Sequence, residues 1–175
     1  AEDGDAAALT AAGAVLGTLG FAVIGVTAVL WVLPEPLVQL QFPRFSPETT
    51  ALTVHLTRIV LPAQIFLVIG GTLQALLLAQ KHFTASALAP LIYNARTIAG
   101  GIFFHDALGI DGFAVGTLIG AALGPFLMPL LFMRGYIKLR PVLSPLGRDF
   151  KAYLALAAPL MCGQTLLTLD EWYGR

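Results

Sequence analysis

The chain has 175 residues, of which 57% are hydrophobic and only 11% are charged, whereas soluble domains average about 25% charged residues. Ten basic and ten acidic residues cancel, so the net charge favours neither a nucleic-acid partner nor a strongly charged substrate. The single cysteine, Cys162, excludes an intramolecular disulfide. This composition predicts an all-α, polytopic membrane protein.

Five apolar stretches predict five transmembrane helices, over residues 6–33, 52–79, 83–104, 113–133 and 150–175. Each is long enough to cross the roughly 30 Å hydrocarbon core at about 1.5 Å per residue. A backbone in hydrocarbon has no water to bond, so each stretch must close its own hydrogen bonds as a helix. We therefore expect the whole chain to form one transmembrane helical region.

The first stretch follows a polar end, where Asp3 or Asp5 can cap a helix that begins near Ala6. Trp31 lies near the end of this helix, where an interfacial aromatic side chain is expected. Small residues leave one face on which a neighbouring helix can approach closely, namely glycines 13, 17, 20 and 25. The chain has neither an initiator methionine nor a basic signal region, and we expect an internal piece of a longer protein.

Four prolines between residues 34 and 50 disfavour helix. We expect an external connection there, with one interfacial turn over residues 37–40. The second helix carries more polar and helix-breaking residues than a helix facing only lipid tolerates, namely Pro62, Gln64, Gly70, Gly71 and Gln74. They predict a kink, neighbouring helices and some buried polar contact.

The second and third helices form a hairpin around the polar break at residues 80–82, and residues 105–112 predict a short polar turn after it. The fourth helix has Gly116, Gly120 and Gly124 at a spacing of four, which lines one face with small residues for close packing. Pro125 and Pro129 should bend this helix.

Basic residues in short loops orient a membrane protein. Lys81 must share a side with five further basic residues, namely Arg134, Lys138, Arg140, Arg148 and Lys151. The opposite side has Arg44, with Arg58 at a helix entrance. We therefore expect the amino end, the 80–82 turn and the 134–151 break to face the cytoplasm.

Arg96 lies near the middle of the third helix, where insertion scales give an arginine a cost of about 2.5–3.5 kcal/mol. Such a residue normally faces a bundle interior or water. Its functional interpretation is an anion contact in a cavity. The alternatives are a structural ion pair and a side chain that reaches toward the membrane interface. The candidate cavity or substrate contacts are Arg96, Asn94 and Gln164.

Asp170 and Glu171 form a second ionisable group at depth. Paired carboxylates can hold a cation or carry a proton, since oxygen ligands suit hard ions. They equally fit the polar exit of the last helix. Of the two, Asp170 is the candidate cation-binding residue.

The three histidines, His55, His82 and His105, are predicted at helix ends, where a solvated or capping histidine is ordinary. None belongs to an HExxH spacing, and no serine has a GxSxG context, so we expect no metal site, no catalytic residue and no cofactor, and the chain is not an enzyme. The paired glycines at 70–71 and 100–101 lack a phosphate-loop lysine and are interpreted as packing glycines.

Three blocks of sequence carry a family resemblance: RIVLPAQIFLVIGGTLQALLLAQKHFTASALAPLIYN, DGFAVGTLIGAALGPFLMPLL and LAAPLMCGQTLLTLDEWYGR. In order and spacing they resemble the MurJ/MviN-type lipid II flippases of the multidrug/oligosaccharidyl-lipid/polysaccharide exporter superfamily. The resemblance implies part of a transporter of about fourteen helices, in which this chain supplies the third to seventh helix. On that alignment Asp170 corresponds to an acidic cation ligand of the seventh helix.

The resemblance further implies flipping of an undecaprenyl-linked peptidoglycan precursor across the bacterial inner membrane by alternating access. Such a role serves cell-wall biosynthesis and cell shape, involves membrane lipids as partners, and is open to sodium or proton coupling. A multidrug or polysaccharide-lipid exporter of the same superfamily, a membrane enzyme acting on lipid, and a non-transporting membrane scaffold are the alternatives.

Overall fold

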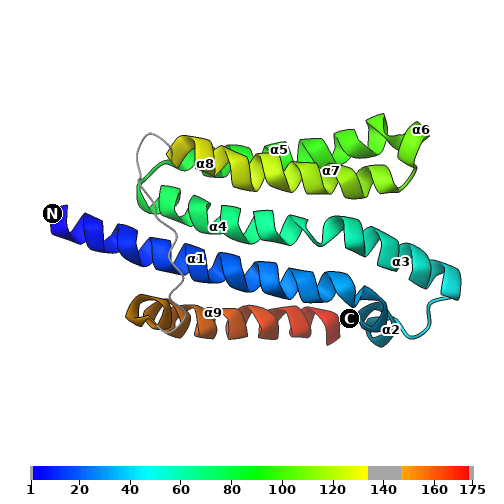
Figure 1. Cartoon of the computed structure of the whole chain (residues 1–175), viewed down its shortest axis with the longest axis horizontal. Helices are drawn as coiled ribbons and strands as arrows, with labels where there is room; N and C mark the ends of the chain where they lie inside the picture. Colours follow the sequence, from blue (N-terminus) through cyan, green and yellow to red (C-terminus); the bar gives the residue numbers. More distant parts are fainter. Residues whose placement is uncertain (1, 134–146, 174–175) are drawn as a thin grey trace. The chain divides into compact units, whose positions relative to one another are not determined.

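The computed structural model describes residues 2–133 and 147–173, and these contain helices and no strand, which confirms the all-α prediction. In chain order they are α1 (Glu2–Val32), α2 (Pro34–Gln41), α3 (Pro47–Val60), α4 (Ala63–Ala79), α5 (Phe83–Phe103), α6 (His105–Leu108), α7 (Asp111–Ala121), the π-helix η1 (Ala122–Leu127), α8 (Met128–Met133) and α9 (Arg148–Tyr173) (Figure 1). The chain divides into two compact units, residues 1–18 with 139–175, and residues 19–138.

Among the described residues, three helical stretches are long and apolar enough to cross a membrane, Thr10–Val32, Pro47–Ala79 and Asp111–Met133, and α9 contributes the shorter apolar stretch Phe150–Gly163. These stretches confirm a membrane protein. α5 has 21 residues but is not one of the three, because Asn94 and Arg96 near its middle lower its hydropathy. A helix of this kind needs neighbouring helices beside it in a bilayer.

Several helices begin earlier than their hydropathy predicts. α1 begins at Glu2 rather than near Ala6, and α3 begins at Pro47 rather than at residue 52. Proline is tolerated in the first helical turn, where its missing N–H has no partner to lose. The Ser46 hydroxyl caps α3 by accepting a hydrogen bond from the Thr49 backbone N–H at 3.2 Å.

The two expected connections are also partly helical. The proline-rich segment forms α2, in which prolines occupy the first turn, rather than a connection with a single turn. The segment 105–112, predicted as a polar turn, contains α6 and the start of α7. Asp106 and Asp111 lie in the first turns of these helices, where a carboxylate is favoured by the helix dipole.

The kink predicted at Pro62 is a full break that separates α3 from α4. Proline has no N–H, so in a continuous helix the carbonyl of Arg58, four residues earlier, would lose its donor. The indole N–H of Trp31 donates to this carbonyl at 3.0 Å. The predicted interfacial aromatic therefore closes a backbone hydrogen bond that proline leaves open.

A second proline site widens the next membrane stretch into the π-helix η1. Pro129 cannot donate to the Pro125 carbonyl, and Pro125 lacks its own N–H, so the α-helical ladder fails here. Gln74 on α4 donates from Nε2 to the Pro125 carbonyl at 3.4 Å. Gly70, one turn earlier, lies against the same carbonyl, where any Cβ would clash. The predicted buried polar contact thus involves Gln74.

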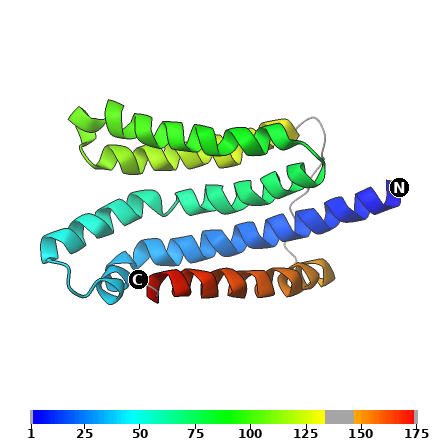
Figure 2. The same ribbon diagram turned by 180° about the vertical axis from the view of Figure 1, so that it is seen from behind.

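The most extensive helix packing in residues 19–133 is that of α5 along α7, which lie side by side in opposite views (Figures 1 and 2). A methyl group added at Gly116 would lie 2.8 Å from the Arg96 carbonyl oxygen and 2.9 Å from the Gly100 Cα atom. One added at Gly112 would lie 2.8 Å from the Gly100 carbonyl oxygen. At these positions the two backbones touch directly.

The line of glycines that contacts α5, here called the glycine seam, continues along α7 into η1. Its members are Gly112, Gly116, Gly120 and Gly124. A methyl group at Gly120 would lie 2.8 Å from the Tyr93 carbonyl oxygen, and one at Gly124 would lie 2.5 Å from the Ala89 carbonyl oxygen. The predicted packing role of the glycines spaced by four is confirmed. Small residues matter here because lipid tails offer no hydrophobic drive for helices to associate, and close backbone contact supplies the attraction.

Not every glycine predicted to pack does so. Among the residues that the structure describes, a Cβ at Gly71 or at Gly25 would meet no atom within 4 Å, and one at Gly20 would meet Ile69 at an ordinary 3.7 Å. The small face predicted on α1 therefore makes no close backbone contact with the described residues at Gly20 or Gly25. Helical periodicity separates Gly70 from Gly71 by about 100°, so only one of the pair can face η1.

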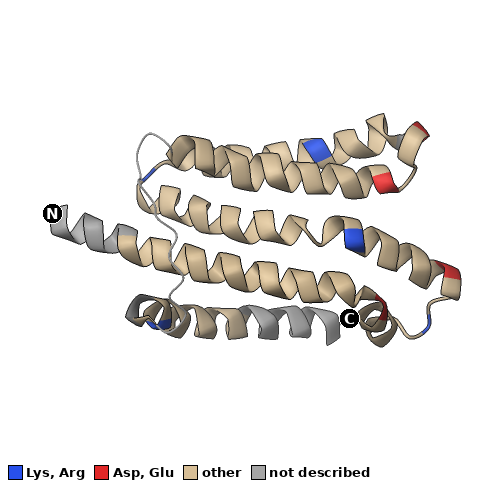
Figure 3. Cartoon of the chain, in the orientation of Figure 1, with Lys and Arg blue, Asp and Glu red and all other residues tan. Residues whose placement is uncertain are grey.

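The hairpin between α4 and α5 is closed by a helix-ending motif. The N–H of Lys81 donates to the Leu78 carbonyl at 2.9 Å, and that of His82 donates to the Leu77 carbonyl at 2.8 Å. Lys81 takes the left-handed conformation, with φ of 64°, that glycine usually supplies. This residue puts a positive charge at the turn between α4 and α5, and Figure 3 shows acidic residues at the other end of α5, where α6 and α7 begin.

We expect Gly116→Ala to lower the stability of the intact protein and Gly71→Ala to leave it unchanged or raise it. Alanine is favoured over glycine inside a helix by about 0.5–1 kcal/mol. At Gly116 that gain is exceeded because the new methyl group must displace backbone atoms, and overpacking costs about 1–3 kcal/mol. Thermal unfolding of both variants in the same detergent measures the difference. Equal shifts in unfolding temperature would contradict the packing faces described above.

Candidate functional site

The predicted contact residue Arg96 lies on α5 and is exposed. Its side chain lines a cavity of about 370 Å³ between α5 and the η1–α8 segment. The other lining residues are Ile92, Ala95, Leu123, Leu127, Met128 and Leu131. No ion pair or hydrogen bond joins its guanidinium to the described residues. The arrangement is a single cation among apolar side chains, which suits an anion attached to an apolar chain.

Asn94 does not line this cavity. Residues two apart on a helix point in nearly opposite directions, so Asn94 and Arg96 lie on different faces of α5. Gln164 and Asp170 belong to α9, but their side chains lie outside the described residues. Asn94 and Arg96 are therefore not brought together.

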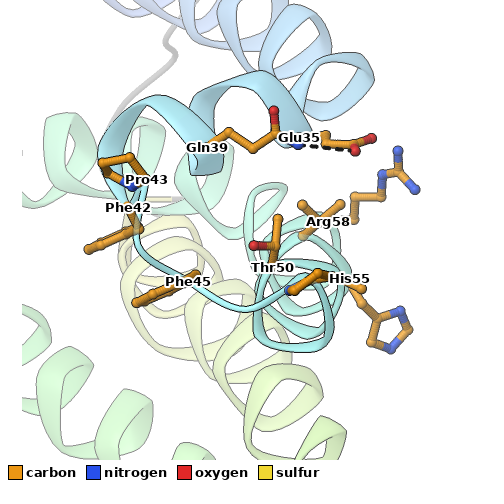
Figure 4. Close-up of a pocket in the computed structure, with 11 residues that line it drawn as sticks. Glu35, Gln39, Phe42, Pro43, Phe45, Thr50, His55 and Arg58 are labelled. Atoms are coloured by element: carbon orange, nitrogen blue, oxygen red, sulfur yellow. Dashed lines mark hydrogen bonds between the residues drawn. The ribbon is translucent and has the colours of Figure 1, made fainter.

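A larger cavity, of about 700 Å³, lies between α2 and α3 (Figure 4). Its polar side chains include Glu35 and Gln39 from α2, and His55 and Arg58 from α3. Glu35 and Gln39 are four residues apart and His55 and Arg58 are three apart, so each pair lies on one helical face. The two helices therefore turn polar faces toward one another.

The charges of this cavity remain separate. Glu35 and Arg58 point to the same side of the cavity, yet no ion pair joins them (Figure 4). The Glu35 carboxylate accepts a hydrogen bond from Gln39 Nε2 at 3.3 Å. The Arg58 backbone carbonyl is bonded to Trp31, while its guanidinium has no partner among the residues described. One acidic and one basic group are thus both available to a ligand.

His55 departs from its prediction as a solvated or capping residue at a helix end. It lies within α3, and its Nε2 atom is 2.8 Å from Asp111 Oδ2 of α7. The contact is partly exposed, with 57% of the His55 side chain and 30% of the Asp111 side chain accessible, so it contributes less than about 1 kcal/mol. It ties the wall of the larger cavity to the helix that carries the glycine seam.

Sequence reasoning missed the larger cavity because it treated residues 34–50 as a connection. The spacing of Glu35 and Gln39, and of His55 and Arg58, was the available signal. That signal gains meaning only once residues 34–41 are known to be helical, since the same spacing in an irregular connection does not define a face.

A family model described as lipid II flippase MurJ matches residues 2–170. No curated protein and no solved structure matches the chain. Members of this family are transporters of the bacterial membrane that act on lipid II, a lipid-linked precursor of peptidoglycan. Because the match extends over nearly the whole chain and agrees with its apolar helices, the chain belongs to the MurJ family of lipid II flippases.

Proposed function

We propose that the intact protein flips lipid II across the bacterial inner membrane by alternating access, and so supplies precursor for cell-wall synthesis. The family match over residues 2–170 is the observation that carries this proposal. The helix break at Pro62 and the π-helix η1 support it, since helix ends and kinks permit rigid-body rocking of one part of a transporter against another. In this assignment the 80–82 turn faces the cytoplasm, in accord with the basic residues counted in the sequence.

The Arg96 cavity holds an anionic group of the lipid-linked cargo. An unpaired arginine in an apolar surrounding needs an anion, and the apolar residues of η1 and α8 favour one that carries a lipid chain. Asp170 contributes to the site of a coupling cation, sodium or a proton, and Gln164 lies near it in sequence. Asn94, which does not line the Arg96 cavity, has a cargo-contact role only if cargo also meets the opposite face of α5.

Depletion of the protein from a bacterium that depends on it should cause undecaprenyl-linked precursor to accumulate. Flipping is the step between synthesis of the precursor inside the cell and its use outside, so loss of the transporter leaves the precursor behind. Extraction and quantification of lipid-linked precursor during depletion measures the effect. Normal precursor levels would contradict the proposal and favour a drug exporter or a non-transporting scaffold.

Arg96→Gln should weaken lipid II binding by the intact protein roughly ten- to hundredfold, the equivalent of losing one hydrogen bond to a charged group. Arg96→Lys should retain part of the affinity because it keeps the charge. Arg44→Gln is the matched control, since Arg44 is an exposed arginine that lines neither cavity. Binding of labelled lipid II in detergent measures all three, and equal affinities for Arg96→Gln and Arg44→Gln would remove Arg96 from the cargo site.

Asp170→Asn should abolish the cation dependence of lipid II transport while leaving the protein folded. An amide keeps the size of the carboxylate but removes its charge, so a bound sodium or proton loses its main attraction. Transport into proteoliposomes, measured with and without sodium and across a range of pH, separates the two ions. Unchanged sodium stimulation together with an unchanged pH profile would remove Asp170 from the coupling site.

A further inference from the structure

The cavity between α2 and α3 lies at the level of a membrane surface. The membrane-spanning stretch of α1 ends at Val32, and the next begins at Pro47, so α2 connects two spans on one side of the bilayer. Trp31, beside the cavity, is an aromatic residue of the kind that anchors a helix end at the interface. α2 also exposes Leu37 and Leu40. These features place the cavity where phospholipid headgroups lie.

The charged groups of the cavity fit a ligand that bears both signs of charge. The Arg58 guanidinium can bind a phosphate through two parallel hydrogen bonds, and no described carboxylate competes for it. The Glu35 carboxylate already accepts one hydrogen bond from Gln39, and its oxygens can accept more, from an ammonium group. His55 lines the same cavity but is engaged with Asp111.

The size of the cavity agrees with a whole headgroup rather than a free ion. A volume of about 700 Å³ lies in the range of roughly 300–1,000 Å³ found for small-molecule sites and exceeds what one phosphate needs. Phe42 and Phe45 line the cavity with stacked rings whose centroids are 4.7 Å apart. Figure 4 shows both rings on the side away from Glu35 and Arg58, so the cavity has a charged side and an apolar side.

We propose that this cavity binds the headgroup of a zwitterionic phospholipid with a primary ammonium group, of the phosphatidylethanolamine class. The phosphate lies at Arg58 and the ammonium lies at Glu35. A primary ammonium is favoured over a trimethylammonium because only the former donates hydrogen bonds to Glu35. The bound lipid bridges α2 and α3. It therefore lies close to the helix break at Pro62, which follows Arg58 in the chain.

The test uses the intact protein in detergent, incubated with equal amounts of phosphatidylethanolamine, phosphatidylcholine and phosphatidylglycerol that share the same acyl chains. Native mass spectrometry counts the lipids retained. We expect phosphatidylethanolamine to be retained about two- to fivefold more than either competitor, the ratio that a partly exposed charge contact produces. Equal retention of the three lipids, or preferential retention of phosphatidylglycerol as at a site for anions alone, would overturn the proposal.

Two variants separate the two charges. Glu35→Gln should remove the preference for phosphatidylethanolamine over phosphatidylglycerol, because only the ammonium contact is lost. Arg58→Gln should lower retention of all three lipids about two- to fivefold, because each carries a phosphate. Circular dichroism of each variant checks that its helices are intact.

The matched controls are Glu48→Gln and Arg44→Gln, which change exposed charges outside the cavity, in the first turn of α3 and just before it. Both should retain the wild-type preference. Identical behaviour of Glu35→Gln and Glu48→Gln would show that general surface charge, rather than this cavity, selects the lipid. Lipid retention is measured without transport, so this result is independent of whether the protein flips lipid II.

Discussion

The organisation of residues 19–133 depends on a constraint of the helical backbone: a carbonyl that proline leaves without its helical donor accepts a hydrogen bond from another helix. Two prolines create this need. The Arg58 carbonyl accepts a hydrogen bond from Trp31 of α1, and the Pro125 carbonyl accepts one from Gln74 of α4. The prolines thereby convert breaks within single helices into contacts between helices, which fix α3 against α1 and α4 against η1.

The glycine seam holds α5 against α7 through close backbone packing rather than through hydrogen bonds. α5 carries a mid-helix arginine and is less apolar than the three clear spans, so its place beside α7 rests on close backbone contact. The carbonyl of Arg96 lies on the seam while its guanidinium lines the cavity beside η1 and α8. One residue therefore takes part in packing through its backbone and in a candidate binding site through its side chain.

The Arg96 cavity and the cavity between α2 and α3 have different chemistry, and this difference separates the ligands proposed for them. Beside Arg96 the lining is apolar except for one cation, as expected for an anion attached to a lipid chain. Between α2 and α3 both signs of charge are present with stacked phenylalanines, as expected for a zwitterionic headgroup. A headgroup bound in the second cavity would lie next to the helix break at Pro62.

The sequence by itself determined the membrane class, the all-α fold, the glycine seam and the positions of the breaks at Pro62 and Pro125. Each of these follows from hydropathy, residue spacing or the missing proline N–H, which are properties of neighbouring residues. Only the tertiary structure decided that Gln74 donates to the Pro125 carbonyl, that His55 contacts Asp111, and that Glu35 and Arg58 line one cavity. The physical reason is that these contacts join residues on different helices, and helical periodicity fixes the face of a side chain without fixing which helix lies opposite.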